Sequence, residues 1–380
     1  MVMATKVSLK RTPLYHAHVS SGAKIMPFAG YEMPLHYHGG IIEEHNWTRK
    51  NAGLFDVGHM GVARILDKSG SHDRAAQAIE KLVPADIQEL PPGFQRYTQL
   101  TNTDGGILDD LIISRSPDRK HEGMLTLVLN AARKNLDYAH IDSYLPTGVK
   151  LQPLSDFMLL ALQGPAASDV IKSYDIRADS MRFMSVATIT IAGTQIQLSR
   201  SGYTGEDGFE LLVPTEKAIE IWESISSDPR VKPIGLGARN CLRLEAGLCL
   251  YGHDLDETTS PVEACLTWSI QKTRRQKGGF LGERRILDEI RVGPQRKRVG
   301  LMSSHQALAR EGTPIHDVSG KLRGSVTSGS YGPTVAGPVA MGYIQACNSE
   351  VGTDVFLMIR GKACAAKVVA LPFVHHHYKR

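Results

Sequence analysis

The sequence has no long hydrophobic run. Its densest apolar stretches, residues 125–129 and 157–162, are as long as single strands, whereas a membrane-spanning helix needs about 20 apolar residues. The 380 residues include only five cysteines, and no two of them have Cys-x-x-Cys spacing. We therefore predict reduced core thiols rather than a disulfide framework, and a chain that does not span a membrane.

Several motifs that identify common enzyme classes are also missing. The sequence has neither a Walker A motif nor a dinucleotide-binding glycine fingerprint, and it shows no legible Ser-His-Asp or Cys-His arrangement. His36 and His38 form a single His-x-His pair, and the tract His375–His377 is too short to define a metal site. We predict no metal site, and we interpret the terminal tract as a tail or a tag remnant.

Charge of either sign is moderate. The 44 basic and 39 acidic side chains give a net charge of +5, and the basic residues are scattered or lie in short runs. This distribution argues against a dedicated nucleic-acid binder and is compatible with an anionic ligand or an acidic partner. Residues 272–277 and 296–298 could attract an acidic carrier protein, but a solvated domain boundary explains these runs better.

The N-terminal region has no acidic residue before Glu32, but it contains Lys6, Lys10 and Arg11. A basic, acid-free leader is typical of organelle transit segments, although residues added for expression explain it equally well. The leader indicates the mitochondrial matrix if the source is eukaryotic. Otherwise we expect the cytoplasm.

The pattern of apolar residues predicts an α+β protein of two or three domains, since one domain typically has about 150 residues. We expect strands at 124–130, 157–162 and 181–191 and helices at 131–145, 166–174 and 216–227. Asn130 is placed to cap the first of these helices. From Val299 onward, short β-prone runs alternate with glycine- and proline-containing turns, which is typical of a small antiparallel barrel.

The segment Gly105-Gly-Ile-Leu-Asp-Asp110 places two adjacent carboxylates in a strand that follows an Asp-Gly-Gly turn. Side chains alternate along a strand, so Asp109 and Asp110 lie on opposite faces and cannot share a proton with each other. Only one of them can serve a given pocket. On a half-buried apolar face a carboxylate holds its proton more tightly, which suits proton exchange near neutral pH. The structural alternative is a carboxylate at the strand edge that accepts hydrogen bonds from the N–H groups of the turn.

A second glycine-spaced turn, in the segment Ser201-Gly-Tyr-Thr-Gly-Glu-Asp-Gly208, presents Tyr203 and leads into a strand that carries Glu210. Glu210 lies on the face opposite Phe209 and Leu211. A planar heterocycle such as a pterin offers two parallel N–H donors that fit one carboxylate. A structural ion pair with an arginine would satisfy Glu210 equally well.

The segment Gly235-Leu-Gly-Ala-Arg239 begins a predicted helix in which Arg239 and Arg243 lie four residues apart on one face. Two guanidinium groups there could clamp the carboxylates of a ligand. Pairing of one or both with nearby acids such as Glu245 or Asp254 is the structural alternative.

Short segments spread along the chain match one protein family both in their residues and in their order. They are Arg11-Thr-Pro-Leu-Tyr15, Pro27-Phe-Ala-Gly-Tyr-Glu-Met-Pro-Leu35, Leu54-Phe-Asp-Val-Gly-His-Met60, Gly105-Gly-Ile-Leu-Asp-Asp110, Leu162-Gln-Gly-Pro165, Gly202-Tyr-Thr-Gly-Glu-Asp-Gly208, Gly235-Leu-Gly-Ala-Arg239, Leu244-Glu-Ala246, Thr327-Ser-Gly329 and Pro372-Phe373. Together they resemble the aminomethyltransferases, the T-protein family of the glycine cleavage system. The resemblance runs from about Lys10 to Val374, nearly the whole chain.

The resemblance implies a three-domain, cloverleaf-like fold, with two α/β domains of mixed or antiparallel sheets and a C-terminal β-barrel. The implied domains are residues 1–52 with 146–240, residues 53–145 with 241–290, and residues 295–380.

The resemblance also implies an enzyme that transfers the methylene carbon from the aminomethyl-lipoyl arm of H-protein to tetrahydrofolate. The products are ammonia, 5,10-methylenetetrahydrofolate and dihydrolipoyl H-protein. Lipoylated H-protein is thus the implied partner and tetrahydrofolate the co-substrate, without nucleic acid or membrane.

The same resemblance assigns roles residue by residue. Asp110 matches the catalytic carboxylate, which agrees with the argument that one carboxylate faces each side of the strand. Glu210 matches the residue that recognises the pterin edge, Tyr203 lies in the folate-contacting turn, and Arg239 matches an arginine near the folate's glutamate end. The matching pocket-lining positions are Met60, Tyr97 and Asn130.

The sequence departs from the family pattern at three of these segments. Tyr31 stands where the family usually has tryptophan, and Gly58 stands where it usually has serine. Asn240 replaces the usual aspartate and removes a charge from the beginning of the helix that carries Arg239, so ligand affinity could change there.

Two other functions stay open. Related folate-binding factors of iron-sulfur assembly or tRNA modification carry a K-G-C-Y-x-G-Q-E segment, whereas this chain has Ser201-Gly-Tyr-Thr-Gly-Glu-Asp-Gly208 without the cysteine. A stand-alone folate-dependent demethylase is the second alternative. The chain leaves no room for the oxidase half that accompanies such a domain in fused demethylases.

Overall fold

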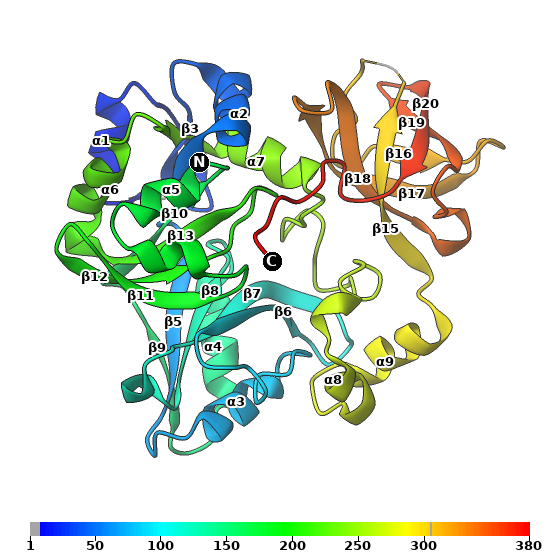
Figure 1. The fold of residues 1–380 in the computed structure, drawn as a ribbon. Helices are drawn as coiled ribbons and strands as arrows, with labels where there is room; N and C mark the ends of the chain where they lie inside the picture. The colour runs from blue at the N-terminus through cyan, green and yellow to red at the C-terminus, as the bar shows by residue number, and fades with distance from the viewer. Residues whose placement is uncertain (1–7, 305) are drawn as a thin grey trace, which may run out of the picture.

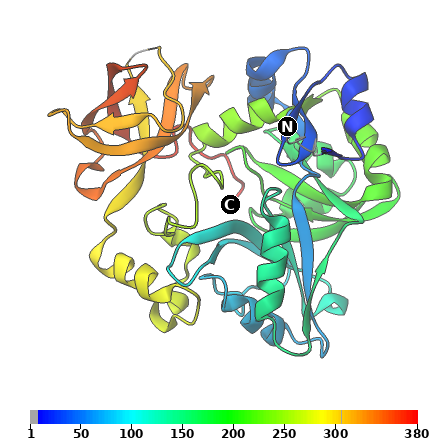
Figure 2. The same cartoon turned by 180° about the vertical axis from the view of Figure 1, so that it is seen from behind.

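The computed structural model describes residues 8–304 and 306–380. Two units of sheets and helices and a barrel surround the centre of the molecule, and the C-terminus ends at this centre (Figure 1). The view from behind shows the same three-part arrangement (Figure 2). The structure thus confirms the predicted fold class. No helix in the described ranges is long and apolar enough to cross a membrane.

A six-stranded sheet forms the core of the first unit. Its order is β11-β12-β13-β10-β4-β14, and it is antiparallel except for the β4–β14 pair. The strands are β4 (Ala52–Asp56), β10 (Phe157–Gln163), β11 (Val186–Ile191), β12 (Thr194–Ser199), β13 (Gly208–Pro214) and β14 (Val231–Ile234). Helices α5 (Ala167–Lys172) and α6 (Ala218–Ser226) pack on one face, and α2 (Gly40–Lys50) and α7 (Leu236–Glu245) pack on the other. Because both faces are covered, β10 is apolar almost throughout.

A five-stranded antiparallel sheet forms the second unit, in the order β6-β7-β8-β5-β9. Its strands are β5 (Gly61–Asp67), β6 (Phe94–Thr101), β7 (Ile107–Arg115), β8 (Met124–Leu129) and β9 (Val149–Pro153). Side chains of α3 (His72–Glu80) and α4 (Lys134–Tyr144) complete its core. Strand β9 pairs with β5 although it follows the expected boundary at residue 146. The domain limits themselves stay a prediction.

A small three-stranded sheet precedes these units, in the order β1-β3-β2. It comprises β1 (Lys10–Arg11), β2 (Lys24–Phe28) and β3 (Tyr31–His36), and α1 (Tyr15–Ser20) lies between β1 and β2 in the chain. The Arg11 guanidinium pairs with Glu32 at 2.5 Å. Of the basic residues in the expected leader, Lys6 lies outside the described residues, whereas Lys10 and Arg11 belong to this sheet.

The C-terminal barrel is closed in the order β15-β18-β17-β16-β19-β20. Its strands are β15 (Arg296–Ser303), β16 (Pro314–His316), β17 (Leu322–Gly332), β18 (Gly337–Gln345), β19 (Asp354–Ile359) and β20 (Lys362–Val369). The sequence predicts five strands here, at residues 299–302, 322–327, 339–344, 355–359 and 365–369, and each lies within an observed strand. The three-residue β16 is the strand that the sequence pattern did not reveal. Helices α8 (Lys272–Lys277) and α9 (Glu283–Val292) connect the second unit to the barrel.

Three local predictions were wrong. Helix α4 starts at Lys134 and Asn130 does not cap it, because the Asn130 side chain is bound to acidic groups described below. The strand expected at 181–191 starts only at Val186, since Met184 has a positive φ of 68° that a strand cannot accommodate. All five cysteines are free, as predicted, but Cys265 and Cys347 are exposed rather than part of the core.

Glu245 joins the first unit to the barrel. Its side chain is fully buried at the end of α7. One oxygen accepts a hydrogen bond from Thr334 N at 2.7 Å in the β17–β18 turn, and the other accepts from Arg49 Nη2 at 2.9 Å and lies 3.2 Å from His45 Nε2. Although burial raises it, these donors lower the pKa of Glu245 to about 2. The ionised carboxylate therefore anchors the barrel on α7.

Replacing Glu245 with alanine should strongly destabilise the protein. The substitution removes one of the two carboxylates that pair with the buried Arg49, the other being Glu206, and it leaves Thr334 N without its acceptor. Breaking a buried ion pair typically costs about 3–5 kcal/mol. Urea unfolding followed by circular dichroism measures the loss. The control is Glu220→Ala, which removes an exposed ion pair with Lys217 and should cost less than about 1 kcal/mol. Equal stabilities of the two variants would show that Glu245 is not an anchor.

Candidate active site

A cavity of about 1260 Å³ lies where the two sheets, α7 and the barrel meet. The chain's C-terminal segment forms part of its wall. The seven side chains to which the resemblance assigns roles all line this cavity, although they come from six separate parts of the chain. They are Met60, Tyr97, Asp110, Asn130, Tyr203, Glu210 and Arg239.

The turn between β6 and β7 fixes where Asp110 enters the cavity. Asn102 Oδ1 accepts hydrogen bonds from the N–H groups of Asp104 and Gly106, both at 2.9 Å. Gly105 has a φ of 79°, and a Cβ on Gly106 would lie 1.7 Å from the carbonyl oxygen of Glu257. Both positions therefore require glycine. The turn sets the register of β7, in which Asp110 lies opposite Gln99.

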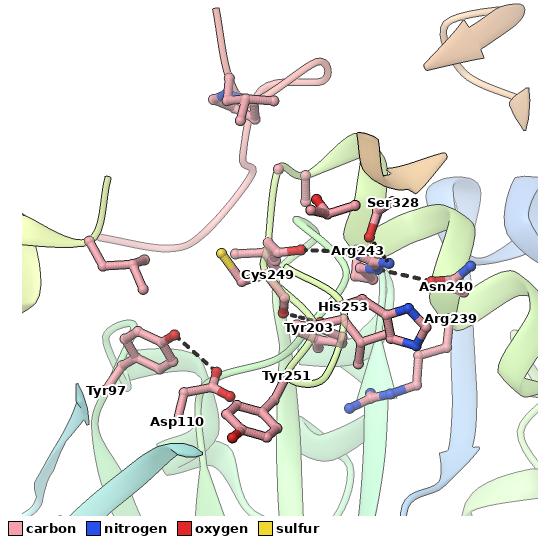
Figure 3. Close-up of a pocket in the computed structure, with 18 of the residues that line it drawn as sticks. Tyr97, Asp110, Tyr203, Arg239, Asn240, Arg243, Cys249, Tyr251, His253 and Ser328 are labelled. Carbon is pink, nitrogen blue, oxygen red and sulfur yellow. Dashed lines mark hydrogen bonds between the residues drawn. The ribbon is translucent and has the colours of Figure 1, made fainter. Parts of the chain in front are cut away.

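Asp110 faces the cavity, whereas Asp109 is fully buried on the other side of β7, as strand alternation predicted. Tyr97 donates its hydroxyl hydrogen to Asp110 Oδ2 at 2.9 Å, and Asn130 Nδ2 donates to Oδ1 at 2.7 Å; Figure 3 shows the bond from Tyr97. Burial and the neighbouring Asp109 raise the pKa of Asp110 from 3.8 to about 7 against the lowering effect of these donors. The group can thus gain or lose a proton near neutral pH.

Asn130 connects the two adjacent acids. It lies directly after β8, where its backbone N–H donates to Asp109 Oδ2 at 3.0 Å. Its side-chain Nδ2 donates to Asp109 Oδ1 at 2.9 Å as well as to Asp110. The residue that the sequence suggested as a helix cap therefore holds the carboxyl groups in place.

Glu210 approaches the cavity from β13, in the other sheet. Its Oε2 accepts a hydrogen bond from Ser201 Oγ at 2.7 Å, and its Oε1 accepts none from the residues that the structure describes. An arginine ion pair, the structural alternative, is not formed within the same residues. Tyr203, in the preceding turn, donates its hydroxyl hydrogen to the carbonyl of Cys249 (Figure 3). A carboxylate with one free oxygen thus faces the cavity beside an aromatic ring.

The two arginines of α7 have different surroundings. Arg243 is buried and donates to Asp254 at 2.7 Å and to Asn240 Oδ1 at 2.9 Å, so it is a structural residue. Figure 3 shows the contact with Asn240. Arg239 has no acidic partner among residues 8–304 and 306–380; its guanidinium lies 4.8 Å from the centre of the Tyr203 ring, and its buried Nη1 makes no hydrogen bond there. Burial lowers the pKa of Arg239, while the nearby Tyr203 and Glu210 act in the opposite direction. Of this pair, Arg239 is the cation available to a ligand.

Met60 and its neighbours form the wall near β3. Lys134 Nζ donates to Tyr31 OH at 2.9 Å and to the carbonyl of His59 at 2.8 Å, which gives Tyr31 a polar role that tryptophan would not fill in the same way. Burial lowers the pKa of His59 to about 4, so its ring is neutral. A Cβ on Gly58 would lie 2.6 Å from Met158 Cε, so the usual serine would require that side chain to move.

Two further parts of the wall were missed in the sequence. Trp268 stacks on Tyr97 with ring centroids 5.5 Å apart and is 64% exposed, so it lies at an opening of the cavity. The C-terminal segment runs from the barrel to the first unit, where Tyr378 stacks on Phe183 at 4.0 Å. No local signal marks either role, since both depend on contacts between distant segments.

The histidines near the chain terminus belong to this C-terminal segment. His376 Nε2 lies 2.8 Å from the carbonyl of Ala246, and His377 Nδ1 lies 2.9 Å from Glu206 Oε2. The tract interpreted as a tail or tag remnant therefore has specific contacts. Within the described ranges, no three His, Cys, Asp or Glu side chains are grouped so as to hold a metal ion.

Two protein-family models match the chain. The model described as the GCVT N-terminal domain matches residues 14–274, and the model described as the glycine cleavage T-protein C-terminal barrel domain matches residues 296–375. Together they cover both large sheets, the barrel and most of the residues that line the cavity.

Full-length relatives agree with these matches. A probable mitochondrial aminomethyltransferase of Schizosaccharomyces pombe is 42% identical over 380 residues, which cover 99% of this chain and 95% of that protein. A mitochondrial aminomethyltransferase of Dictyostelium discoideum is 41% identical over 390 residues, covering 98% of this chain and 94% of that protein. The crystal structure of the glycine cleavage system aminomethyltransferase T from Bartonella henselae superposes with a TM-score of 0.91 at 40% identity, covering 98% of this chain and 100% of that chain.

Burying Asp110 should reduce stability at neutral and alkaline pH. Its pKa is raised from 3.8 to about 7, so the folded state keeps a proton that the unfolded chain releases, and stability falls as pH rises through this range. Asp110→Asn should therefore melt at a higher temperature than the parent at about pH 8, with little difference at about pH 4. Differential scanning calorimetry measures both. The exposed turn variant Asp104→Asn is the control, and equal melting of Asp110→Asn and the parent at alkaline pH would contradict the raised pKa.

Proposed function

Because this chain belongs to the glycine cleavage T-protein family and is an aminomethyltransferase of the glycine cleavage system, we propose that its central cavity binds tetrahydrofolate and that Asp110 is the catalytic carboxylate. The observation that carries this proposal is that Asp110 and Glu210, which belong to different sheets, face the same cavity. In this reaction the carbon of an aminomethyl group on a lipoyl arm passes to the folate. The bonds from that carbon to sulfur and to the amino nitrogen break, which releases a dihydrolipoyl arm and ammonia.

The free polar groups of the cavity fit a reduced folate. A pterin edge presents N–H donors, and the unpaired oxygen of Glu210 is an acceptor for them. The glutamate part of a folate carries carboxylates, and Arg239 is a cation without an acidic partner in the described part of the chain. Tyr203 and Met60 add aromatic and apolar surface along the wall.

Asp110 would act on protons rather than as a nucleophile. Tetrahydrofolate supplies the two nitrogens that form bonds to the carbon, and their two protons balance those gained by the departing sulfur and amino groups. The Asp110 carboxylate would accept a hydrogen bond from an N–H of that ligand, orient it and take up or release a proton as the amino group departs. Tyr97 and Asn130 hold both carboxylate oxygens, so the group does not need to reorient before it reacts. A pKa of about 7 suits this task at neutral pH.

We propose that the lipoyl arm of H-protein enters past Trp268. This side chain is exposed at the cavity wall and stacks on Tyr97, which contacts Asp110 directly. Only part of the charge in the basic runs at 272–277 and 296–298 is available to attract the carrier, because four of the seven basic side chains are exposed: Lys272, Arg275, Lys277 and Lys297. Arg274 and Arg298 are buried. Arg296 is also engaged, because it pairs with Glu263 at 3.1 Å.

We also propose that the protein works in the mitochondrial matrix. The relatives in Schizosaccharomyces pombe and Dictyostelium discoideum are named as mitochondrial. Lys10 and Arg11 of the expected leader are part of the folded chain.

The central test is the Asp110→Asn variant in an assay that measures ammonia and methylenetetrahydrofolate together, with tetrahydrofolate and an aminomethylated lipoyl carrier as substrates. Loss of a proton-handling group typically reduces turnover by about a hundredfold or more, and we expect that loss here. Calorimetry should show that folate still binds. Near-normal turnover would remove Asp110 from the mechanism.

Glu210 should act in binding. In Glu210→Ala the pterin edge loses a charged acceptor, which we expect to weaken tetrahydrofolate affinity about tenfold or more, while turnover at saturating folate changes less. Titration calorimetry measures the affinity. The matched control is Glu216→Ala, an exposed acid shortly after the same strand. An unchanged dissociation constant for Glu210→Ala would refute this role.

A further inference from the structure

A second pair of acids lies behind Asp110, away from the cavity. Asp109 on β7 is 0% exposed, and Asp137 in the first turn of α4 is 1% exposed. The two carboxyl groups are neighbours, since each one shifts the pKa of the other, and Asp137 Oδ2 is buried without a hydrogen-bond donor among the described residues. A hydrogen bond between two carboxyl groups needs a proton, and two buried carboxylates in contact cannot both be ionised. The pair therefore retains one proton and carries one negative charge.

Asn130 links this pair to the cavity. Its side-chain Nδ2 lies between Asp109 Oδ1 at 2.9 Å and Asp110 Oδ1 at 2.7 Å, and its backbone N–H donates to Asp109 Oδ2. Both Asp109 oxygens thus accept hydrogen bonds from one residue that also holds Asp110. A negative charge on Asp109 lies close enough to Asp110 to raise the pKa of Asp110. The same charge on Asp137 lies one hydrogen bond farther away.

The surrounding groups do not neutralise the pair. Arg133 Nε lies 3.9 Å from Asp137 Oδ1, too far for a hydrogen bond, and another nitrogen of this guanidinium lies 3.1 Å from Glu257. Tyr251 packs against Arg133 at 5.7 Å, and Tyr138 follows Asp137 on α4. Burial and the neighbouring acids raise the pKa of both tyrosines, so both are neutral. Because Arg133, the only close cation in the described ranges, is shared with Glu257, a retained proton is the remaining way to satisfy Asp109 and Asp137.

We propose that Asp109 and Asp137 are a proton-sharing pair of positioning residues that orient Asp110 through Asn130 and control the charge beside it. Neither residue touches the cavity, so neither acts on a ligand directly. The position of the shared proton decides whether the negative charge lies next to Asp110 or on α4. This inference rests on the proposed role of Asp110, and it adds that the Asp109–Asp137 pair sets the pH at which Asp110 loses its proton.

Two isosteric variants fix the charge on opposite sides of the shared hydrogen bond. In Asp137→Asn the amide donates a hydrogen bond to Asp109 but cannot ionise, so the negative charge stays on Asp109. This charge lies next to Asp110, which therefore keeps its proton to a higher pH. Asp109→Asn leaves the charge on Asp137, and Asp110 releases its proton at a lower pH. We expect the midpoint of Asp110 to be roughly one pH unit higher in Asp137→Asn than in Asp109→Asn.

NMR titration of isotope-labelled aspartate carboxyl carbons measures this midpoint directly, and the rising limb of kcat/KM against pH should move with it. The matched control is Asp142→Asn, an exposed acid on the same helix, which should leave the midpoint unchanged. Equal midpoints in the two variants, or the reverse order, would overturn the proposal.

The parent protein provides a test that does not depend on how well the variants fold. In its NMR titration the carboxyl carbons of Asp109 and Asp137 should show one retained proton at neutral pH and titrate in two steps. Two ionised groups at neutral pH would overturn the pair. Failure of the proposed function is a different result: Asp110→Asn would keep its turnover, while the NMR midpoints would still report on the pair.

Discussion

The site depends on burying the Asp110 carboxyl group beside a cavity with neutral donors instead of a cation. Tyr97 and Asn130 hold its two oxygens, and no lysine or arginine of the described ranges contacts it. An arginine in their place would keep the carboxylate ionised, whereas neutral donors leave its pKa at about 7. The units around the cavity must therefore be stable enough to carry this unfavourable burial.

That stability comes from charges that are paired elsewhere. Glu245 accepts hydrogen bonds from Arg49 on α2 and from Thr334 in the barrel. Arg243, on the same helix, pairs with Asp254. One turn earlier Arg239 has no acidic partner in the described part of the chain, and Glu210 keeps one oxygen free. Helix α7 thus uses one face to fasten the barrel and another to offer a charge to the cavity. Paired groups hold the architecture, whereas these two unpaired groups line the cavity.

Strand alternation was sufficient to predict that Asp110 and Asp109 would face opposite sides, and turn chemistry was sufficient to place Tyr203 before Glu210. Both inferences use neighbours within a few residues. Asn130 was misassigned as a helix cap because its actual partners lie about twenty residues earlier in the chain. Asp137 gave no signal at all, since its partner becomes visible only when α4 packs on the sheet. The part of the site that depends on neighbours within a few residues could be predicted from the sequence, whereas the part that depends on contacts between distant segments could not.

The cavity is completed by the end of the chain, which ties ligand binding to assembly of the three units. Val374 N donates to the carbonyl of Glu245 at 3.0 Å, and His377 N donates to the carbonyl of Gly205 at 2.8 Å, so the last segment leads from the barrel back to the first unit. This part of the wall exists only while the barrel is docked on α7. Any ligand that contacts it binds the assembled state in preference to the open one. By linkage, such a ligand stabilises barrel docking by the same free energy with which docking favours binding.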